Sequence, residues 1–152
     1  MNDDLLVNDD ALEFFNSLSG TLAIELTEPA QPIGGLLNLA ASPNARISSL
    51  RLEAEYFDPD TEEGRPLTEP ELSRPVFRGS VLRLRGESGL VVSHHAPDGS
   101  QFTVKALLAA VEATELQSRG ATEWLGGVDV HHIYFEGIHP SDDGAWEIFW
   151  GS

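Results

Sequence analysis

The fold is decided by one stretch, residues 102–120, which reads FTVKALLAAVEATELQSRG. Its apolar residues recur at helical spacing and form one stripe: Val104, Leu107, Leu108 and Val111. Thr103 is a suitable N-cap, and Arg119 with Gly120 supplies a favourable last-turn charge and a C-terminal stop. We therefore predict a main helix over residues 103–119.

Alternating apolar and polar residues predict strands on both sides of this helix. The predicted strands are residues 22–26, 50–56, 76–85, 90–96, 128–138 and 145–150. Short connections at residues 86–89 and 141–144 predict two antiparallel hairpins. Before the first strand, Asn8 or Asp9 can cap a short N-terminal helix that runs through Leu18.

These elements predict an α+β fold in a single domain over residues 1–152. A single helix cannot cover many strands, so we expect an antiparallel sheet of about five to six strands curled around the helix at 103–119. The short N-terminal helix then closes an edge or an end of the sheet. Residues 58–75 hold four prolines and six carboxylates, which indicates an acidic, proline-rich surface loop.

The negative charge of the chain limits the kinds of molecule that it can bind. The chain has a formal net charge of −16, and residues 1–45 and 120–152 contain no Lys or Arg. Such a field repels phosphate groups, so we expect neither direct nucleic-acid binding nor attachment to an anionic membrane. A basic protein is the partner that it attracts.

The composition also bears on compartment and cofactors. The sequence has no Cys, which excludes disulfides and thiolate ligands. No apolar run approaches the ~18 residues that span a bilayer, and the acidic start does not resemble a secretory signal. We expect a cytoplasmic protein without a cofactor.

The histidines are the first candidates for chemistry. They occur as two adjacent pairs and one single residue: His94, His95, His131, His132 and His139. Because neighbouring strand residues point to opposite faces, only one member of each pair can reach a shared site. His132 and Glu136 share a face and are the preferred metal or acid-base residues, followed by His131 and His95. Histidines packed in the core or across strands explain the same pattern.

Residues 58–69 resemble the spacing of an EF-hand calcium loop. Acidic residues occupy its first, third, fifth and twelfth positions: Asp58, Asp60, Glu62 and Glu69. The loop departs from the pattern because glycine stands at position seven, Arg65 stands at position eight, and prolines occur at Pro59 and Pro66. A solvated acidic loop is the alternative.

Aromatic residues gather towards the C-terminus and suggest an interaction surface. Alternation points Trp146 and Ile148 into the core, on the same face as Trp150, and leaves Phe149 and Phe135 for the other face. Exposed aromatic residues on an acidic sheet are typical of protein-binding surfaces. The candidate interaction residues are Phe135, Phe149, Trp124 and Trp150. Core packing alone is the competing explanation.

Known catalytic motifs are missing from the chain. It contains no Gly-x-Ser-x-Gly, Gly-x-Gly-x-x-Gly or P-loop sequence. We therefore expect a non-enzymatic, acidic protein-interaction domain that acts as a binding partner, an inhibitor or a chaperone, or within a larger assembly. The alternative is a small metal-dependent or acid-base enzyme that uses histidine and carboxylate groups. Homo-oligomers are compatible with each interpretation.

Overall fold

The computed structural model describes residues 11–26, 31–32, 39–40, 47–120 and 132–151. Asn8, Asp9, Trp124 and His131 lie outside these residues. The described strands are β1 (Ser19–Leu26), β2 (Gln31–Pro32), β3 (Leu39–Ala40), β4 (Ile47–Asp58), β5 (Glu63–Pro66), β6 (Pro75–Arg78), β7 (Val81–Arg85), β8 (Val91–His95), β9 (Gln101–Thr103), β10 (Tyr134–Pro140) and β11 (Trp146–Gly151). The helices are α2 (Glu69–Leu72) and α3 (Val104–Gly120), and residues 11–16 are helical as well.

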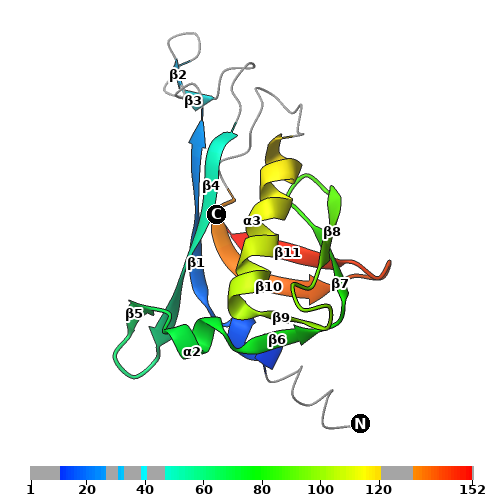
Figure 1. Cartoon of the computed structure of the whole chain (residues 1–152). Coiled ribbons are helices and arrows are strands. Elements are labelled where there is room, and N and C mark those ends of the chain that lie inside the picture. Colours follow the sequence, from blue (N-terminus) through cyan, green and yellow to red (C-terminus); the bar gives the residue numbers. More distant parts are fainter. Residues whose placement is uncertain (1–10, 27–30, 33–38, 41–46, 121–131, 152) are drawn as a thin grey trace.

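The α+β class is confirmed, and its main sheet has the strand order β5-β4-β1-β10-β11-β7-β8 (Figure 1). All neighbours in this sheet are antiparallel except β11 and β7, which are parallel and place Trp146 beside Leu84. The expected sheet of five to six antiparallel strands curled around the helix is wrong in three respects. The sheet has seven strands, it is mixed, and it does not curl around the helix.

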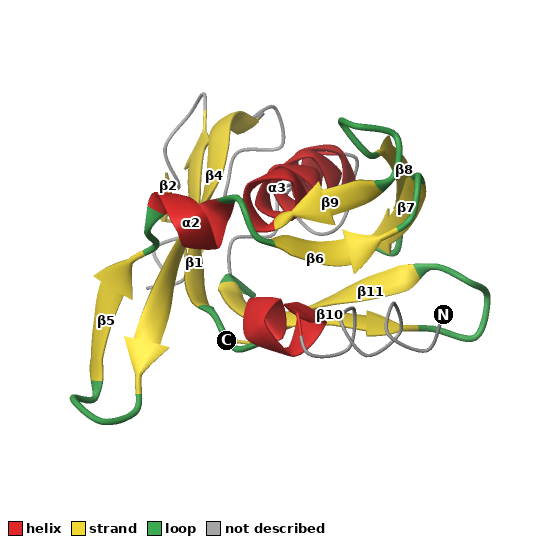
Figure 2. Ribbon diagram, turned by 60° about the horizontal axis from the view of Figure 1, so that its bottom comes forward, coloured by secondary structure: helices red, strands yellow, loops and turns green. Residues whose placement is uncertain are grey.

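Two local features explain these differences. The predicted strand 76–85 breaks at Gly79, which has a φ of 154°. The chain therefore leaves a separate two-stranded sheet, β6 with β9, before it enters the main sheet as β7 (Figure 2). The residues expected as a loop at 58–75 add the further strand β5, which pairs with β4 so that Asp58 lies opposite Glu63.

Segment 58–75 is thus largely regular, although most of its side chains are exposed. After β5 it forms α2, which begins with a capping box between Thr68 and Glu71. Arg65 of β5 donates two hydrogen bonds of 2.9 Å to the Glu71 carboxylate of α2. The guanidinium, followed by the Thr68 backbone N–H, lowers the pKa of Glu71 to about 2.

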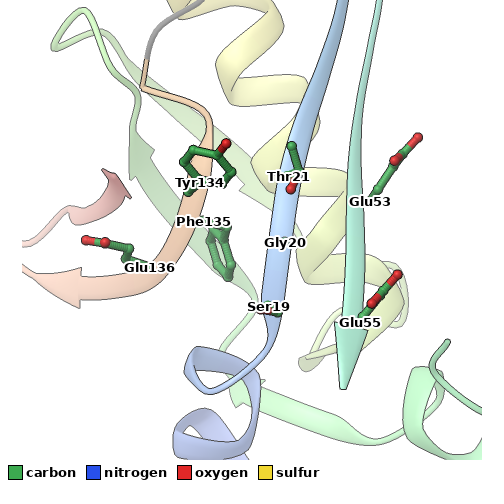
Figure 3. Close-up of a pocket in the computed structure, with 8 residues that line it drawn as sticks. All are labelled: Ser19, Gly20, Thr21, Glu53, Glu55, Tyr134, Phe135 and Glu136. Carbon is green, nitrogen blue, oxygen red and sulfur yellow. The ribbon is translucent and has the colours of Figure 1, made fainter. Parts of the chain in front are cut away.

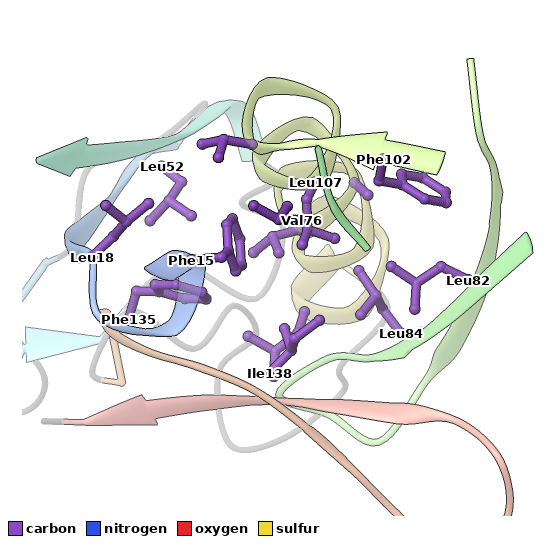
Figure 4. Packing of buried hydrophobic residues seen from close by; sticks show 14 of the residues in the cluster. Phe15, Leu18, Leu52, Val76, Leu82, Leu84, Phe102, Leu107, Phe135 and Ile138 are labelled. Carbon is purple, nitrogen blue, oxygen red and sulfur yellow. The ribbon is translucent and has the colours of Figure 1, made fainter. Parts of the chain in front are cut away.

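The main helix is confirmed in position and in its cap. The Thr103 hydroxyl accepts a hydrogen bond of 3.2 Å from the Ala106 N–H. The inner stripe of α3 packs against side chains from the N-terminal helical turn and from both hairpins of the sheet (Figure 4). The most completely buried apolar side chains of this core include Phe15, Leu82, Leu84, Val104, Leu107, Val111 and Ile138.

A bulge in β10 anchors the N-terminal turn. The register of β10 with β11 shifts between Phe135 and Ile138, and Gly137 has a φ of 95°. The Asn16 amide donates to the Ile138 carbonyl at 3.0 Å and accepts from the Ile138 N–H at 2.9 Å. Asn16 therefore fills the gap that the bulge leaves in the ladder. No helix within the described ranges is long and apolar enough to cross a membrane.

Candidate functional site

An open groove of about 400 Å3 lies on the face of the main sheet opposite the buried core. Its lining comes from residues 19–21 of β1, Glu53 and Glu55 of β4, and residues 134–136 of β10. We call it the acidic groove. It forms because Leu22 and Leu52 turn inward to the core, so that alternate residues of the same strands turn outward.

Strand register brings the groove residues together from distant parts of the chain. Thr21 pairs with Glu53 on one side of β1 and with Tyr134 on the other. Ser19 pairs with Glu55 one step further along. Figure 3 shows Glu53 and Glu55 on one side of β1, with Tyr134 on the other. The short side chains of β1 thus form a floor between higher acidic and aromatic walls.

Glycines on neighbouring strands give the carboxylates room. A Cβ placed on Gly64 of β5 would meet the carboxyl oxygen Oε2 of Glu55, and one on Gly151 of β11 would meet Oε2 of Glu136. The two carboxyl groups therefore extend over the backbone of these glycines. A larger residue at either position would displace an acidic wall of the groove.

The groove carries a concentrated negative charge. Arg51 Nη2 lies 3.9 Å from Glu53 Oε1, and both side chains are largely exposed, so this ion pair neutralises little. Among the described residues, Glu55 and Glu136 take part in no ion pair. Tyr134 is 52% exposed and offers a ring face at the same place. Carboxylates beside an exposed ring can bind ammonium or guanidinium groups.

A second polar cluster is buried and has a structural role. Glu115 and Arg119 of α3 form an ion pair with 2.8 Å between Oε1 and Nε, and neither side chain is exposed. Glu115 Oε2 also accepts from Trp150 Nε1 at 2.8 Å and from the Glu87 N–H at 3.1 Å. Arg119 donates to the His132 carbonyl, and its guanidinium lies 5.2 Å from the centre of the Trp150 ring. The cluster ties the helix to the β7–β8 turn and to β11.

The predicted histidine candidates that the structure describes, His132 and His95, lie in separate environments. His132 Nδ1 is 3.3 Å from Glu87 Oε1 in the β7–β8 turn, whereas Glu136 lines the acidic groove. His95 is exposed on β8, and its neighbour His94 points inward to the Thr114 hydroxyl at 2.6 Å. Burial lowers the pKa of His94. In the part of the chain that the structure describes, no three His, Asp or Glu side chains form a group that could hold a metal ion.

The calcium-loop candidates do not form one continuous loop. Asp58 ends β4, and Asp60 and Glu62 belong to the turn between β4 and β5. Glu69 lies beyond β5, in the first turn of α2. Asp58 Oδ1 accepts from the Asp60 N–H at 2.8 Å, which is an ordinary turn contact.

The aromatic candidates divide between core and surface. Phe135, expected on the exposed face, is buried because the outward positions of β10 belong to Tyr134 and Glu136. Trp150 is half-buried and bonded to Glu115. Phe149 is 43% exposed, and its ring centre lies 4.4 Å from that of His139. Of the described candidates, Phe149 alone offers a largely exposed ring.

Sequence reasoning did not select Tyr134, Glu53 or Glu55 as site residues. Alternation in residues 50–56 places both glutamates on the polar face of a strand, and Tyr134 shares a face with Glu136. The missing information was that β1 lies between these two strands. Comparison of the chain with family models, curated proteins and solved structures found no match.

Proposed function

We propose that this protein is a non-enzymatic interaction domain whose acidic groove binds a basic, extended segment of a partner protein. The observation that carries the proposal is that Glu53, Glu55 and Glu136 line one groove together with the exposed Tyr134. A shallow groove across three strands suits an extended segment of the partner, because every second side chain of such a segment points towards the groove.

Electrostatics favours a basic partner over other ligands. The net charge of −16 attracts a cationic segment over a distance and speeds its encounter. The carboxylates then accept hydrogen bonds from Lys or Arg, and the ring of Tyr134 supports a cation–π contact. Tyrosine is also among the residues that contribute most to protein interfaces.

Peptide binding tests this proposal directly. The probe is a fluorescent octapeptide that alternates Lys and Val, and its anisotropy is followed at low and at physiological salt. We expect binding that weakens as salt rises. A peptide that alternates Glu and Val should not bind.

The variants separate the groove from general charge. Glu53→Gln, Glu55→Gln and Glu136→Gln together should weaken binding of the Lys-Val peptide at least ~10-fold. The matched control changes three exposed glutamates outside the groove to Gln: Glu13, Glu62 and Glu69. Its net charge equals that of the groove variant. Equal weakening in both triple variants, or no binding of the Lys-Val peptide at low salt, would show that the groove is not the site.

A further inference from the structure

Strand β8 forms one edge of the main sheet and lacks the features that usually protect an edge. Its residues, Val91–His95, read VVSHH and include no Lys, Arg, Asp, Glu or Pro. The opposite edge is β5, which contains Glu63, Arg65 and Pro66. Charges and prolines at an edge discourage pairing with another chain. Only the β5 edge carries such protection.

The backbone groups that β8 leaves free can be assigned from two hydrogen bonds. Gly86 N donates to Leu90 O at 2.9 Å, and Ala96 N donates to Ser80 O at 2.8 Å, one at each end of the β7–β8 pairing. Bonded and non-bonded pairs alternate along an antiparallel ladder, so the even-numbered residues between them face β7. The residues that direct N–H and C=O outward are Val91, Ser93 and His95.

The hollow beside this edge has no acidic lining, and the carboxylates nearest to β8 in sequence are Glu87 and Asp98, in the turns that precede and follow it. An open hollow of about 260 Å3 lies between β8 and α3, and its lining includes His94, Phe102, Ala106 and Ala109. No acidic residue belongs to β8 or lines this hollow. In a chain with a net charge of −16, self-association is least opposed at a surface of this kind.

We propose that a second copy of this chain pairs with the β8 edge in antiparallel fashion, about a two-fold axis at Ser93. The three residues that direct N–H and C=O groups outward are symmetric about Ser93. This register therefore gives each of those backbone groups a hydrogen-bond partner in the second copy. Ser93 then lies opposite Ser93 of the second copy, and Val91 lies opposite His95 of the second copy. The main sheets become continuous across the dimer, and the closed two-fold symmetry leaves no further β8 edge to extend. The acidic groove lies on β4, β1 and β10 and remains accessible.

Disulfide trapping tests the register. The chain has no Cys, so Ser93→Cys introduces a single thiol. In a hydrogen-bonded antiparallel pair the Cα atoms lie about 5.5 Å apart, which is within the range of a disulfide of roughly 4.4–6.8 Å. Mild oxidation should convert most of this variant to a covalent dimer. Thr61→Cys, exposed in the β4–β5 turn, is the control and should cross-link much more slowly.

Sedimentation velocity and native mass spectrometry test the non-covalent dimer. Ser93→Lys places two ammonium groups directly opposite each other and should raise the dissociation constant on the order of tenfold or more. Thr61→Lys adds the same charge away from the edge and should leave the dissociation constant unchanged. Circular dichroism establishes that each variant is folded. The proposal fails if the wild-type chain stays monomeric up to near-millimolar concentration, if Ser93→Lys leaves a dimer intact, or if both cysteine variants cross-link equally fast.

Discussion

Replacing Glu115 by Leu tests how far the fold depends on its buried ion pair. The variant removes the carboxylate from Arg119 and also removes the acceptor for Trp150 Nε1 and the Glu87 N–H. Breaking a buried pair at one partner typically costs about 3–5 kcal/mol. We expect Glu115→Leu to lower the free energy of unfolding by about 4 kcal/mol and the melting temperature by roughly 8–16 °C.

A double-mutant cycle shows whether this loss belongs to the pair. Arg119→Met alone should cost about 3 kcal/mol, because it leaves Glu115 without its cation. The double variant removes both charges and should cost about 4 kcal/mol, well below the ~7 kcal/mol expected for independent sites. Urea unfolding followed by circular dichroism provides the free energies. Additivity within ~0.5 kcal/mol would refute the reasoning.

The exposed pair on β4 provides a control for this experiment. Arg51 lies 3.9 Å from Glu53, and both side chains are more than half exposed. Arg51→Met should therefore shift the melting temperature by less than about 2 °C. A shift as large as that of Arg119→Met would mean that burial is not the source of the effect.

Three further predictions concern the backbone and the pH dependence of stability. Gly137→Ala should lower the melting temperature by several degrees in a thermal melt. The reason is that φ is 95° at this bulge and a Cβ would lie 2.8 Å from the Asn16 amide. An unchanged melting temperature would contradict this account. Glu71 has a pKa lowered from 4.5 to about 2 by Arg65, so its contribution is complete above pH 4.5 and is lost as the pH falls towards 2. In thermal melts, the Glu71→Gln variant should lose less stability than the wild type as the pH falls through this range. Parallel plots of melting temperature against pH would argue against the contact between Glu71 and Arg65. His94 has a pKa lowered from 6.5 by burial, so the unfolded chain takes up a proton first and stability should fall as the pH drops below 6.5. His94→Gln should remove that part of the pH dependence, and a variant that keeps the full slope between pH 6.5 and 5 would assign it to another group.

Local pattern predicted the elements better than their arrangement. The helix at 103–119 and the hairpin through residues 86–89 depend on caps, short turns and periodicity, all of which lie within a few residues of each other. The parallel pairing of Trp146 with Leu84 joins two hairpins far apart in sequence, and alternation carries no information about it. The break at Gly79 was not predicted, because one glycine inside a strand pattern does not reveal that the chain changes sheets.

The candidate site was predictable in its parts and not in its assembly. Alternation places Glu53 and Glu55 on one polar face and Tyr134 with Glu136 on another. Alternation carries no information on strand pairing, so it did not predict that β1 pairs with both β4 and β10. The expectation for Phe135 was wrong because its outward or inward direction depends on which face of β10 meets the core.

The parallel junction between β11 and β7 has a consequence for folding kinetics. It joins the two hairpins through only two registered pairs, whereas each hairpin closes over a short loop. Contacts between distant segments form slowly, because the entropy lost on closing the intervening chain must be recovered by the contacts made. We therefore expect the two hairpins to form first and the sheet to be completed last. The amide protons at this seam should then exchange with solvent sooner than those at the centre of either hairpin.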